Sequence, residues 1–254
     1  DIADVYINCA FGCSHRITKS VKLLPQLMRQ EGKLVVSGAL LYEEIYRLGK
    51  FAKRVLAKPK KTLVVTGGAK VSDKIEILKQ FVSTGVKSIF IGGKMANAFL
   101  LAQQQKDLLK PFQIDTLPTK LQSQVEAENA VLLKEINLAE TIIELAEVNK
   151  VNLCLPEDYK IVTDPQSTIF ENKFYPDFSK ELQLDLGEKT ITQFANLFKD
   201  VENVFWNGPL GAYDHAACSY YAEGSLELAK SLFQMALIKP KFSVVIGGGD
   251  SAAI

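Results

Sequence analysis

The chain of 254 residues is long enough to bury a sizeable core, as one large domain or two modest ones. Its 47% hydrophobic and 23% charged residues are ordinary for a soluble globular protein, and a net charge of +1 gives no overall attraction for nucleic acid or an anionic membrane. No apolar run approaches the ~20 residues of a membrane span and no signal peptide opens the sequence. We therefore expect a cytoplasmic protein with neither nucleic acid nor membrane as partner.

The four cysteines, Cys9, Cys13, Cys154 and Cys218, include no CxxC pair and no zinc-ligand spacing. Cys9 and Cys13 are close in sequence, but neither His15 nor a carboxylate completes a familiar metal pattern with them. Because cysteines are usually buried, we expect reduced, packed thiols and a reducing compartment.

The beginning of the chain predicts a strand and a long helix. "DVYINCAFGCSHR" is strand-like at residues 1–8, with no obvious partner strand, and "LLYEEIYRLGKFAKRVLAK" predicts a helix that ends at Pro59. Both ends of the sequence look cut, since the last residues begin a helix too short to hold by itself. We expect a piece of a longer protein.

The next part alternates apolar runs, glycines and amphipathic stretches. "TLVVTGGAKVSDKIEILKQF" predicts a strand at 63–66, a turn at Gly67-Gly68 and a helix from about Ser72. "SIFIGGKMANAFLLAQ" repeats this order, with a strand that ends at Ile91. Because buried parallel strands read as continuous apolar runs, the pattern predicts an α/β fold, a three-layer Rossmann-like parallel sheet with helices on both faces.

The rest of the chain continues the alternation. Helices are expected around 120–128 and 138–147, a strand at 152–155, and a turn-rich surface excursion at 156–186, with or without a short strand. "NVFWNGPLGAYD" and "FSVVIGGGDSAA" predict a third and a fourth strand that end in glycine turns.

The four glycine turns should meet at one edge of the sheet, because parallel α/β sheets bind ligands beyond the carboxyl ends of their strands. Glycine lets a ligand approach backbone amides, and a helix that starts after the turn offers unpaired N–H groups, which suits phosphate. The sequence has neither a Walker A loop nor a GxGxxG fingerprint. One such turn more often reflects tight helix–strand packing, but four in one chain favour a binding site.

Two lysines and one aspartate sharpen this prediction. Lys70 and Lys74 are four residues apart, which would place both on one face of the first turn of a helix. Cations there oppose the helix dipole, so either they are solvated beside Asp73 or a polyphosphate supplies the compensating charge. Asp250, at the matching place after the last strand, either caps a helix or holds Mg²⁺ together with phosphate oxygens.

Two interpretations are open for each of three other polar residues, Asn207, Asp214 and His15. Asn207 either donates to phosphate or caps a turn, and Asp214 either accepts from ribose hydroxyls or is solvated. His15 either lines a substrate site or is a hydrogen-bonded structural residue, and His215 is expected at the surface.

At these residues the chain resembles the phosphoglycerate kinase family. The resemblance is carried, in the family's order, by "GGAKVSDKI" (67–75), "FIGGKMANAFL" (90–100), "LPEDY" (155–159), "LDLGEKTI" (184–191), "VFWNGPLGAYD" (204–214) and "VVIGGGDSAA" (244–253). The first segment is similar to the family's DVYVNDAFGxAHR. The combination of GGAKVSDK, WNGP and GGGDS is highly specific.

The resemblance implies an organisation and an activity. Residues 1–40 would be the end of the phosphoglycerate-binding domain, 41–60 the interdomain helix, and 61–254 most of the nucleotide-binding domain. The intact protein would be a monomer that transfers a phosphoryl group between 1,3-bisphosphoglycerate and ADP, giving 3-phosphoglycerate and ATP, with Mg²⁺ bound to the nucleotide. Its partners would be these small molecules.

The resemblance also implies roles for single residues. The catalytic residues would be Lys70, Gly248 and Gly249. Asp250 would hold the magnesium ion, and His15 and Arg16 would bind phosphoglycerate. The nucleotide-binding residues would be Gly68, Ala69, Lys70, Lys74, Gly92, Gly93, Leu155, Asn207, Pro209, Asp214, Gly247, Gly248, Gly249, Asp250 and Ser251.

The sequence departs from the family pattern at several places. Cys9 replaces an aspartate, Lys94 stands where many members have a third glycine, and Asp214 replaces a glutamate, which shortens its reach to the ribose. The rest of the basic patch and the terminal glycine-rich loop are absent from the sequence, so we expect these 254 residues to bind nucleotide without turnover. A nucleotide-binding module with a regulatory or assembly role stays open. A Rossmann-type oxidoreductase is disfavoured by the missing GxGxxG.

Overall fold

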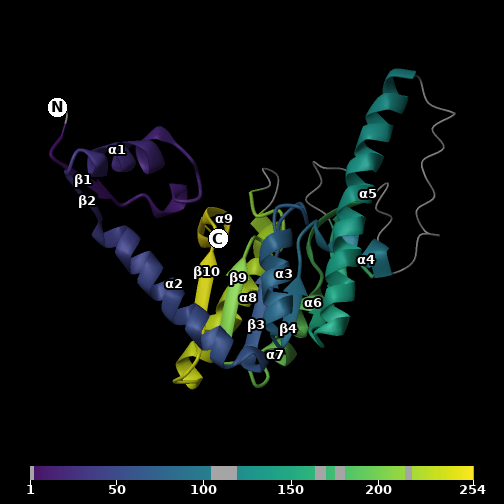
Figure 1. The fold of residues 1–254 in the computed structure, drawn as a ribbon. Helices are drawn as coiled ribbons and strands as arrows, with labels where there is room; N and C mark the ends of the chain where they lie inside the picture. The colour runs from purple at the N-terminus through teal and green to yellow at the C-terminus, as the bar shows by residue number, and fades with distance from the viewer. Residues whose placement is uncertain (1–2, 104–118, 164–169, 175–180, 215–218, 254) are drawn as a thin grey trace. The chain divides into compact units, whose positions relative to one another are not determined.

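The computed structural model describes residues 3–103, 119–163, 170–174, 181–214 and 219–253 (Figure 1). The chain forms two compact units, Asp1–Arg54 and Val55–Ile254. The boundary falls within the long helix α2 (Ala39–Ala57), which ends two residues before Pro59, as the sequence predicts. In the described part of the chain, no helix is both long and apolar enough to cross a membrane.

In the first unit, β1 (Val5–Asn8) pairs in parallel with β2 (Leu34–Ser37). The expectation that the first strand lacks a partner is therefore wrong. β2 is a short apolar run followed by Gly38, so the sequence carries for it the same signal as for the other parallel strands. Between the two strands lie η1 (Phe11–Cys13), the π-helical turn η2 (Lys19–Leu23) and α1 (Leu24–Gln30).

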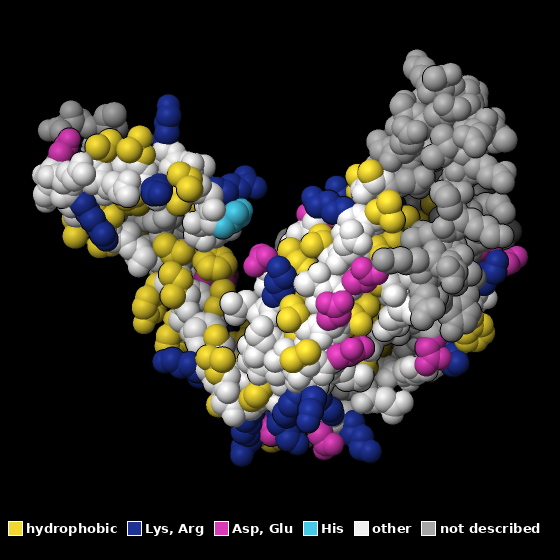
Figure 2. Space-filling model, turned by 45° about the vertical axis from the view of Figure 1, so that its right-hand side comes forward, with side chains coloured by type: hydrophobic (Ala, Val, Ile, Leu, Met, Phe, Trp, Pro, Cys, Tyr) yellow, Lys and Arg dark blue, Asp and Glu magenta, His cyan; other side chains and the backbone are white. Residues whose placement is uncertain are grey.

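Large hydrophobic side chains lie at the surface of this first unit. Ile17 is 83% exposed, and Leu40 and Ile45 on α2 are also exposed. Tyr42 and Tyr46, one turn apart on the same helix, stack with 6.1 Å between ring centroids. Figure 2 shows hydrophobic side chains gathered on the exposed surface of α2. Most of the buried hydrophobic core belongs to the second unit.

The second unit is built on a five-stranded parallel sheet with the strand order β10-β9-β3-β4-β5. The strands are β3 (Thr62–Thr66), β4 (Ser88–Ile91), β5 (Asn152–Cys154), β9 (Asn203–Asn207) and β10 (Ser243–Gly247). Helix α5 (Thr119–Val148) packs against α3 (Ile75–Thr84) and α4 (Ala96–Gln103). The other helices of the unit are α6 (Glu188–Thr192), α7 (Phe194–Leu197), α8 (Glu223–Ile238) and α9 (Gly249–Ala253), and its short turns are η3 (Pro59–Lys61) and η6 (Ser219–Ala222).

Alternation along the central strands produces the layers. Val204 and Trp206 of β9 face a buried cluster that includes Phe194 and Leu228 from α7 and α8. Phe205, between them, faces the other way and packs on Phe81 of α3, with 5.1 Å between ring centroids. Helices therefore cover both faces, and the predicted three-layer α/β fold is confirmed (Figure 1).

Two further expectations are corrected. The helices expected at 120–128 and 138–147 are a single helix, α5. The segment 156–186 is more than a surface excursion, since it contains an antiparallel sheet in the order β7-β6-β8, made of β6 (Tyr159–Val162), β7 (Glu171–Lys173) and β8 (Leu182–Leu186). Lys160 conceals β6 in the sequence: it interrupts the apolar run, yet it is buried and ion-paired with Glu223 of α8.

The thiols differ from expectation as well. Cys9 and Cys13 are exposed free cysteines rather than packed ones. Cys154 is partly buried, and this burial raises the pKa of its thiol while the charge of Lys87 opposes the rise. Cys218 lies outside the described residues. Among the residues that the structure does describe, no group of three or more His, Cys, Asp or Glu could hold a metal.

Candidate functional site

The strand order places a topological switch point between β3 and β9. From β3 the chain runs outward to β4 and β5, and it then returns on the other side as β9 and β10. In such sheets, ligands bind in the crevice beyond the strand ends at this point. The glycine turns after β3 and β9 therefore lie where a ligand is expected.

The two turns are locked together by their backbones. The Gly67 amide donates to the Asn207 carbonyl oxygen at 3.1 Å. A Cβ on Gly67 would lie 2.0 Å from the Pro209 carbonyl oxygen, and Gly208 has φ +99°. Only glycine permits this approach and this conformation, so the turns after β3 and β9 form one unit.

Asn207 gathers residues from three strand ends. Lys74, just before α3, donates from Nζ to Asn207 Oδ1 at 2.7 Å. Gly248, after β10, has φ +91°, and a Cβ there would lie 3.3 Å from the same oxygen. Lys74, Asn207, Gly247 and Gly248 thus form a polar corner, which we call the Asn207 corner.

Ser251 ties α9 to this corner. Its buried side-chain Oγ accepts a hydrogen bond from the Gly208 amide at 2.7 Å, and Trp206 Nε1 donates to the Gly208 carbonyl oxygen at 2.8 Å. Both polar groups of the Gly208 backbone are therefore satisfied inside the protein. The corner is fixed before any ligand arrives.

Asp250 and Asp214 are brought near one another through Tyr213. The pKa of the Tyr213 phenol is raised by desolvation, by the charge and hydrogen bond of Asp250, and by the charge of Asp214. Asp250 is exposed at the start of α9. Its single carboxylate suits a magnesium ion whose other ligands are phosphate oxygens and water.

The two lysines do not share a helix turn. Helix α3 begins at Ile75, so Lys74 is its N-cap residue and Lys70 lies in the preceding turn, exposed to solvent. In this turn the Ser72 amide donates to Glu135 Oε2 of α5 at 2.9 Å. Lys70 therefore lies on a turn, whereas Lys74 belongs to the Asn207 corner.

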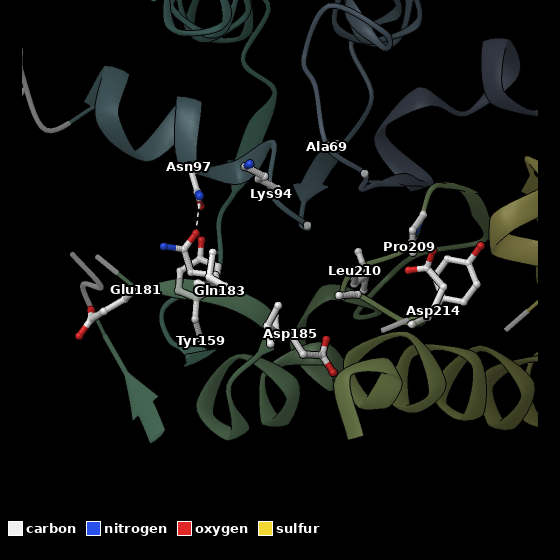
Figure 3. A pocket seen from close by; sticks show the side chains of 17 residues that line it. Ala69, Lys94, Asn97, Tyr159, Glu181, Gln183, Asp185, Pro209, Leu210 and Asp214 are labelled. Carbon is white, nitrogen blue, oxygen red and sulfur yellow. Dashed lines mark hydrogen bonds between the residues drawn. The ribbon is translucent and has the colours of Figure 1, made fainter. Parts of the chain in front are cut away.

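A cavity of about 420 Å³ opens beside the corner (Figure 3). Its walls come from three places: the turns after β3 and β4, with Gly68, Ala69, Gly93 and Lys94; strand β8 at residues 182–185, with Tyr159 behind it; and residues 209–214. Asn97 of α4 and Gln183 of β8 are hydrogen-bonded, as Figure 3 shows. Most of the accessible wall is apolar, which suits a flat ring.

The sequence-predicted residues fall into distinct groups. Gly68, Ala69, Gly93, Pro209 and Asp214 line the cavity. Lys74, Asn207, Gly247, Gly248 and Ser251 form or support the Asn207 corner, Asp250 neighbours Tyr213, and the space beside Gly249 is open.

Gly92, Leu155, His15 and Arg16 lie elsewhere. Gly92 leaves room for Leu210, whose Cδ2 would be 2.7 Å from a Cβ at that position, and Leu155 packs against a cluster of Leu100, Tyr159 and Ile161. In the first unit His15 and Arg16 are exposed neighbours, with Arg16 Nε donating to His15 Nε2 at 3.4 Å. His215 lies outside the described residues.

A family model described as phosphoglycerate kinase matches residues 1–254. This chain belongs to the phosphoglycerate kinase family.

The relatives agree with this assignment. Phosphoglycerate kinases of Anaeromyxobacter sp. strain Fw109-5 and Lactobacillus johnsonii are 31% and 34% identical over 99% of this chain, and the chain spans 55% of each. The chain therefore covers about half the length of these relatives.

Two solved structures share the fold. Phosphoglycerate kinases of Coxiella burnetii and Pyrococcus horikoshii superpose with TM-scores of 0.62 and 0.67, at 24% and 18% identity. Each comparison covers 99% of this chain, and 62% and 61% of the respective solved chains.

Within the phosphoglycerate kinase fold, the sequence reasoning missed the wall formed by β6 and β8. Tyr159, Gln183, Leu184 and Asp185 line the cavity but were not among the candidates. "LDLG" offered a signal, because it is a further strand that runs into a glycine. It was overlooked because it lies within the stretch predicted as a surface excursion.

Proposed function

We propose that residues 61–254 are the nucleotide-binding domain of a phosphoglycerate kinase. The full protein would transfer a phosphoryl group between 1,3-bisphosphoglycerate and Mg-ADP, giving 3-phosphoglycerate and Mg-ATP, as a cytoplasmic monomer in glycolysis. Residues 1–40 would belong to the phosphoglycerate-binding domain, with His15 and Arg16 on its substrate side, and 41–60 would be the connecting helix. Family membership supports this proposal.

One observation carries the assignment of the site: the Asn207 corner and the cavity adjoin at the switch point of the sheet. Residues 207–214 connect them directly, since Asn207 anchors the corner and 209–214 form a cavity wall. A nucleotide needs both parts, because its base and ribose require a mainly apolar recess and its phosphates require cations and backbone amides. Lys74 and the glycine turns supply the second requirement.

The proposed roles follow from position. The base and ribose occupy the cavity, with Asp214 within the wall that meets the sugar. Lys74 and Asn207 hold phosphate oxygens, Lys70 approaches the transferred group from its exposed turn, and Asp250 contributes to the magnesium ion of the substrate. Phosphoryl transfer depends on positioning and charge stabilisation, so this corner performs no covalent step of its own.

The 254 residues alone should bind Mg-ADP but turn it over slowly or not at all. The 254 residues lack the rest of the family's basic patch. In NTPases, an arginine beside the transferring phosphoryl group can raise the rate roughly 10³- to 10⁵-fold. Assaying the chain beside the full-length protein tests this part. Kinase activity of the chain equal to that of the full-length protein would contradict it.

The binding site is tested by titrating Mg-ADP into the chain by calorimetry. Lys74→Met keeps the aliphatic stem and removes the cation, and we expect affinity to fall about tenfold or more, as when a charged hydrogen bond of ~1.5–3 kcal/mol is lost. Lys79→Met, on the same helix but paired with Glu76 on the surface, is the matched control and should bind normally. Unchanged affinity in Lys74→Met, Lys70→Ala and Asp250→Ala would refute the site.

A further inference from the structure

Behind one wall of the cavity lies a buried carboxyl group that the proposed chemistry does not use. Asp185 on β8 is 2% exposed and is one of the residues that line the cavity. Figure 3 shows its carboxylate among the residues that line the cavity. A buried acid beside a ligand site requires an explanation, because an ionised carboxylate is costly to desolvate.

Asp185 contacts its own strand, helix α8 and the loop at 209–214. Its Oδ1 accepts from the Leu186 amide at 2.8 Å, and its Oδ2 accepts from the Gly224 amide at 2.9 Å, at the start of α8. A Cβ on Gly211 would lie 2.3 Å from Oδ1, so the carboxyl group packs directly against residues 209–214, which also line the cavity. The Asp185 side chain therefore contacts β8, α8 and residues 209–214 at once.

Two charges of opposite sign act on Asp185. The charge of Lys160 on β6 stabilises the ionised Asp185 carboxylate, whereas the charge of Glu223 on α8 destabilises it. Lys160 and Glu223 also form an ion pair with each other. Burial then dominates and raises the pKa of Asp185 to about 7, although its two amide hydrogen bonds and Lys160 oppose the rise. Near neutral pH the carboxyl group therefore exists in both protonation states.

We propose that Asp185 is a positioning residue of the nucleotide cavity and that nucleotide binding is coupled to protonation of its carboxyl group. A ligand in the cavity removes water from the wall, and a nucleotide also brings negative phosphates. Both effects favour the neutral acid, so binding takes up a proton. The inference rests on the proposed nucleotide site.

The coupling has a definite sign. If binding raises the pKa of Asp185 by one unit from about 7, Mg-ADP binds roughly fivefold more tightly at pH 6 than at pH 8. Adenosine carries no titrating phosphate, and it should show the same direction with a smaller change. Calorimetry in buffers of different ionisation enthalpy measures the proton uptake directly.

Two variants separate coupling from a structural role. Asp185→Asn mimics the neutral acid, and its binding should lose the pH dependence and the proton uptake. Glu223→Gln leaves Asp185 intact but unpairs Lys160, which favours the ionised form, so the midpoint of the pH dependence should move to lower pH. Glu227→Gln, further along α8 and paired on the surface with Lys230, is the matched control and should behave as the wild type.

The outcomes distinguish the inference from the proposed function. A chain that binds no Mg-ADP at any pH overturns the proposed site and the inference with it. Binding without proton uptake, or with uptake that persists unchanged in Asp185→Asn and Glu223→Gln, overturns the inference alone. If Asp185→Asn fails to fold, the wild-type proton uptake and Glu223→Gln still decide the question.

Discussion

The two halves of the candidate site are fixed by different means. The Asn207 corner is held mainly by backbone groups. Its glycine turns are in contact, the Gly208 amide donates to the Ser251 hydroxyl, and the strands that carry the turns lie in a buried parallel sheet. The cavity wall on β6 and β8 is held by side chains, namely the Asn97–Gln183 pair and the Asp185 carboxyl group with its amide partners. Backbone geometry leaves a trace in the sequence as glycines, whereas a side-chain wall leaves almost none.

The largest expected effect is at the interlocked turns. Gly67→Ala places a Cβ 2.0 Å from the Pro209 carbonyl oxygen, so the two turns must separate, and we expect a loss of about 3 kcal/mol or more in the free energy of unfolding. Urea denaturation measures it. Gly249→Ala, at the open turn after β10, is the control and should stay within about 0.5 kcal/mol. Equal effects would mean that the turn after β10 is fixed as firmly as the other two.

A smaller loss is expected from the hydroxyl that supports the corner. Ser251→Ala removes the acceptor of the buried Gly208 amide, which should cost about 1–3 kcal/mol of stability and weaken Mg-ADP binding. Thermal unfolding and calorimetry report the two quantities. Ser83→Ala, exposed on α3, should be neutral or slightly stabilising. A stable Ser251→Ala protein with normal binding would contradict a pre-fixed corner.

The smallest stability effect is expected on the side-chain wall. Gln183→Leu breaks the bond to Asn97 but is only partly buried, so stability should fall by about 1 kcal/mol or less. Affinity for adenosine should nevertheless change, because the proposed function places the base against this wall. Gln80→Leu, exposed on α3, should alter neither quantity. An unchanged adenosine affinity in Gln183→Leu would place the base elsewhere.

Asp185 should also make the stability of the folded chain depend on pH. Its pKa in the folded chain, about 7, lies above its ordinary value of 3.8, so the neutral acid stabilises the folded state. That stabilisation is complete below about pH 4 and is lost as the pH rises through about 7. Asp185→Asn should therefore remove this part of the pH dependence of unfolding, measured by urea denaturation without nucleotide.

Much of the parallel sheet could be predicted because four of its five strands are apolar runs closed by glycine. β3, β4, β9 and β10 were found this way, and so was the convergence of their turns. β6 could not be found, because buried Lys160 reads as a surface residue until Glu223, 63 residues later, is folded beside it. β2 was not predicted, although it too is a short apolar run that is followed by a glycine, Gly38.

The sequence by itself determined the fold class, the family and the convergence of the glycine turns, because glycines, short apolar runs and the GGAKVSDK, WNGP and GGGDS segments record local backbone requirements. Only the tertiary structure decided which surface completes the cavity, where α3 begins, and that Asp185 is buried with a pKa near neutrality. Those features depend on contacts between residues far apart in the chain, such as Ser72 with Glu135 and Asp185 with Gly224. Burial and electrostatic energy arise from such contacts, and a local pattern does not encode them.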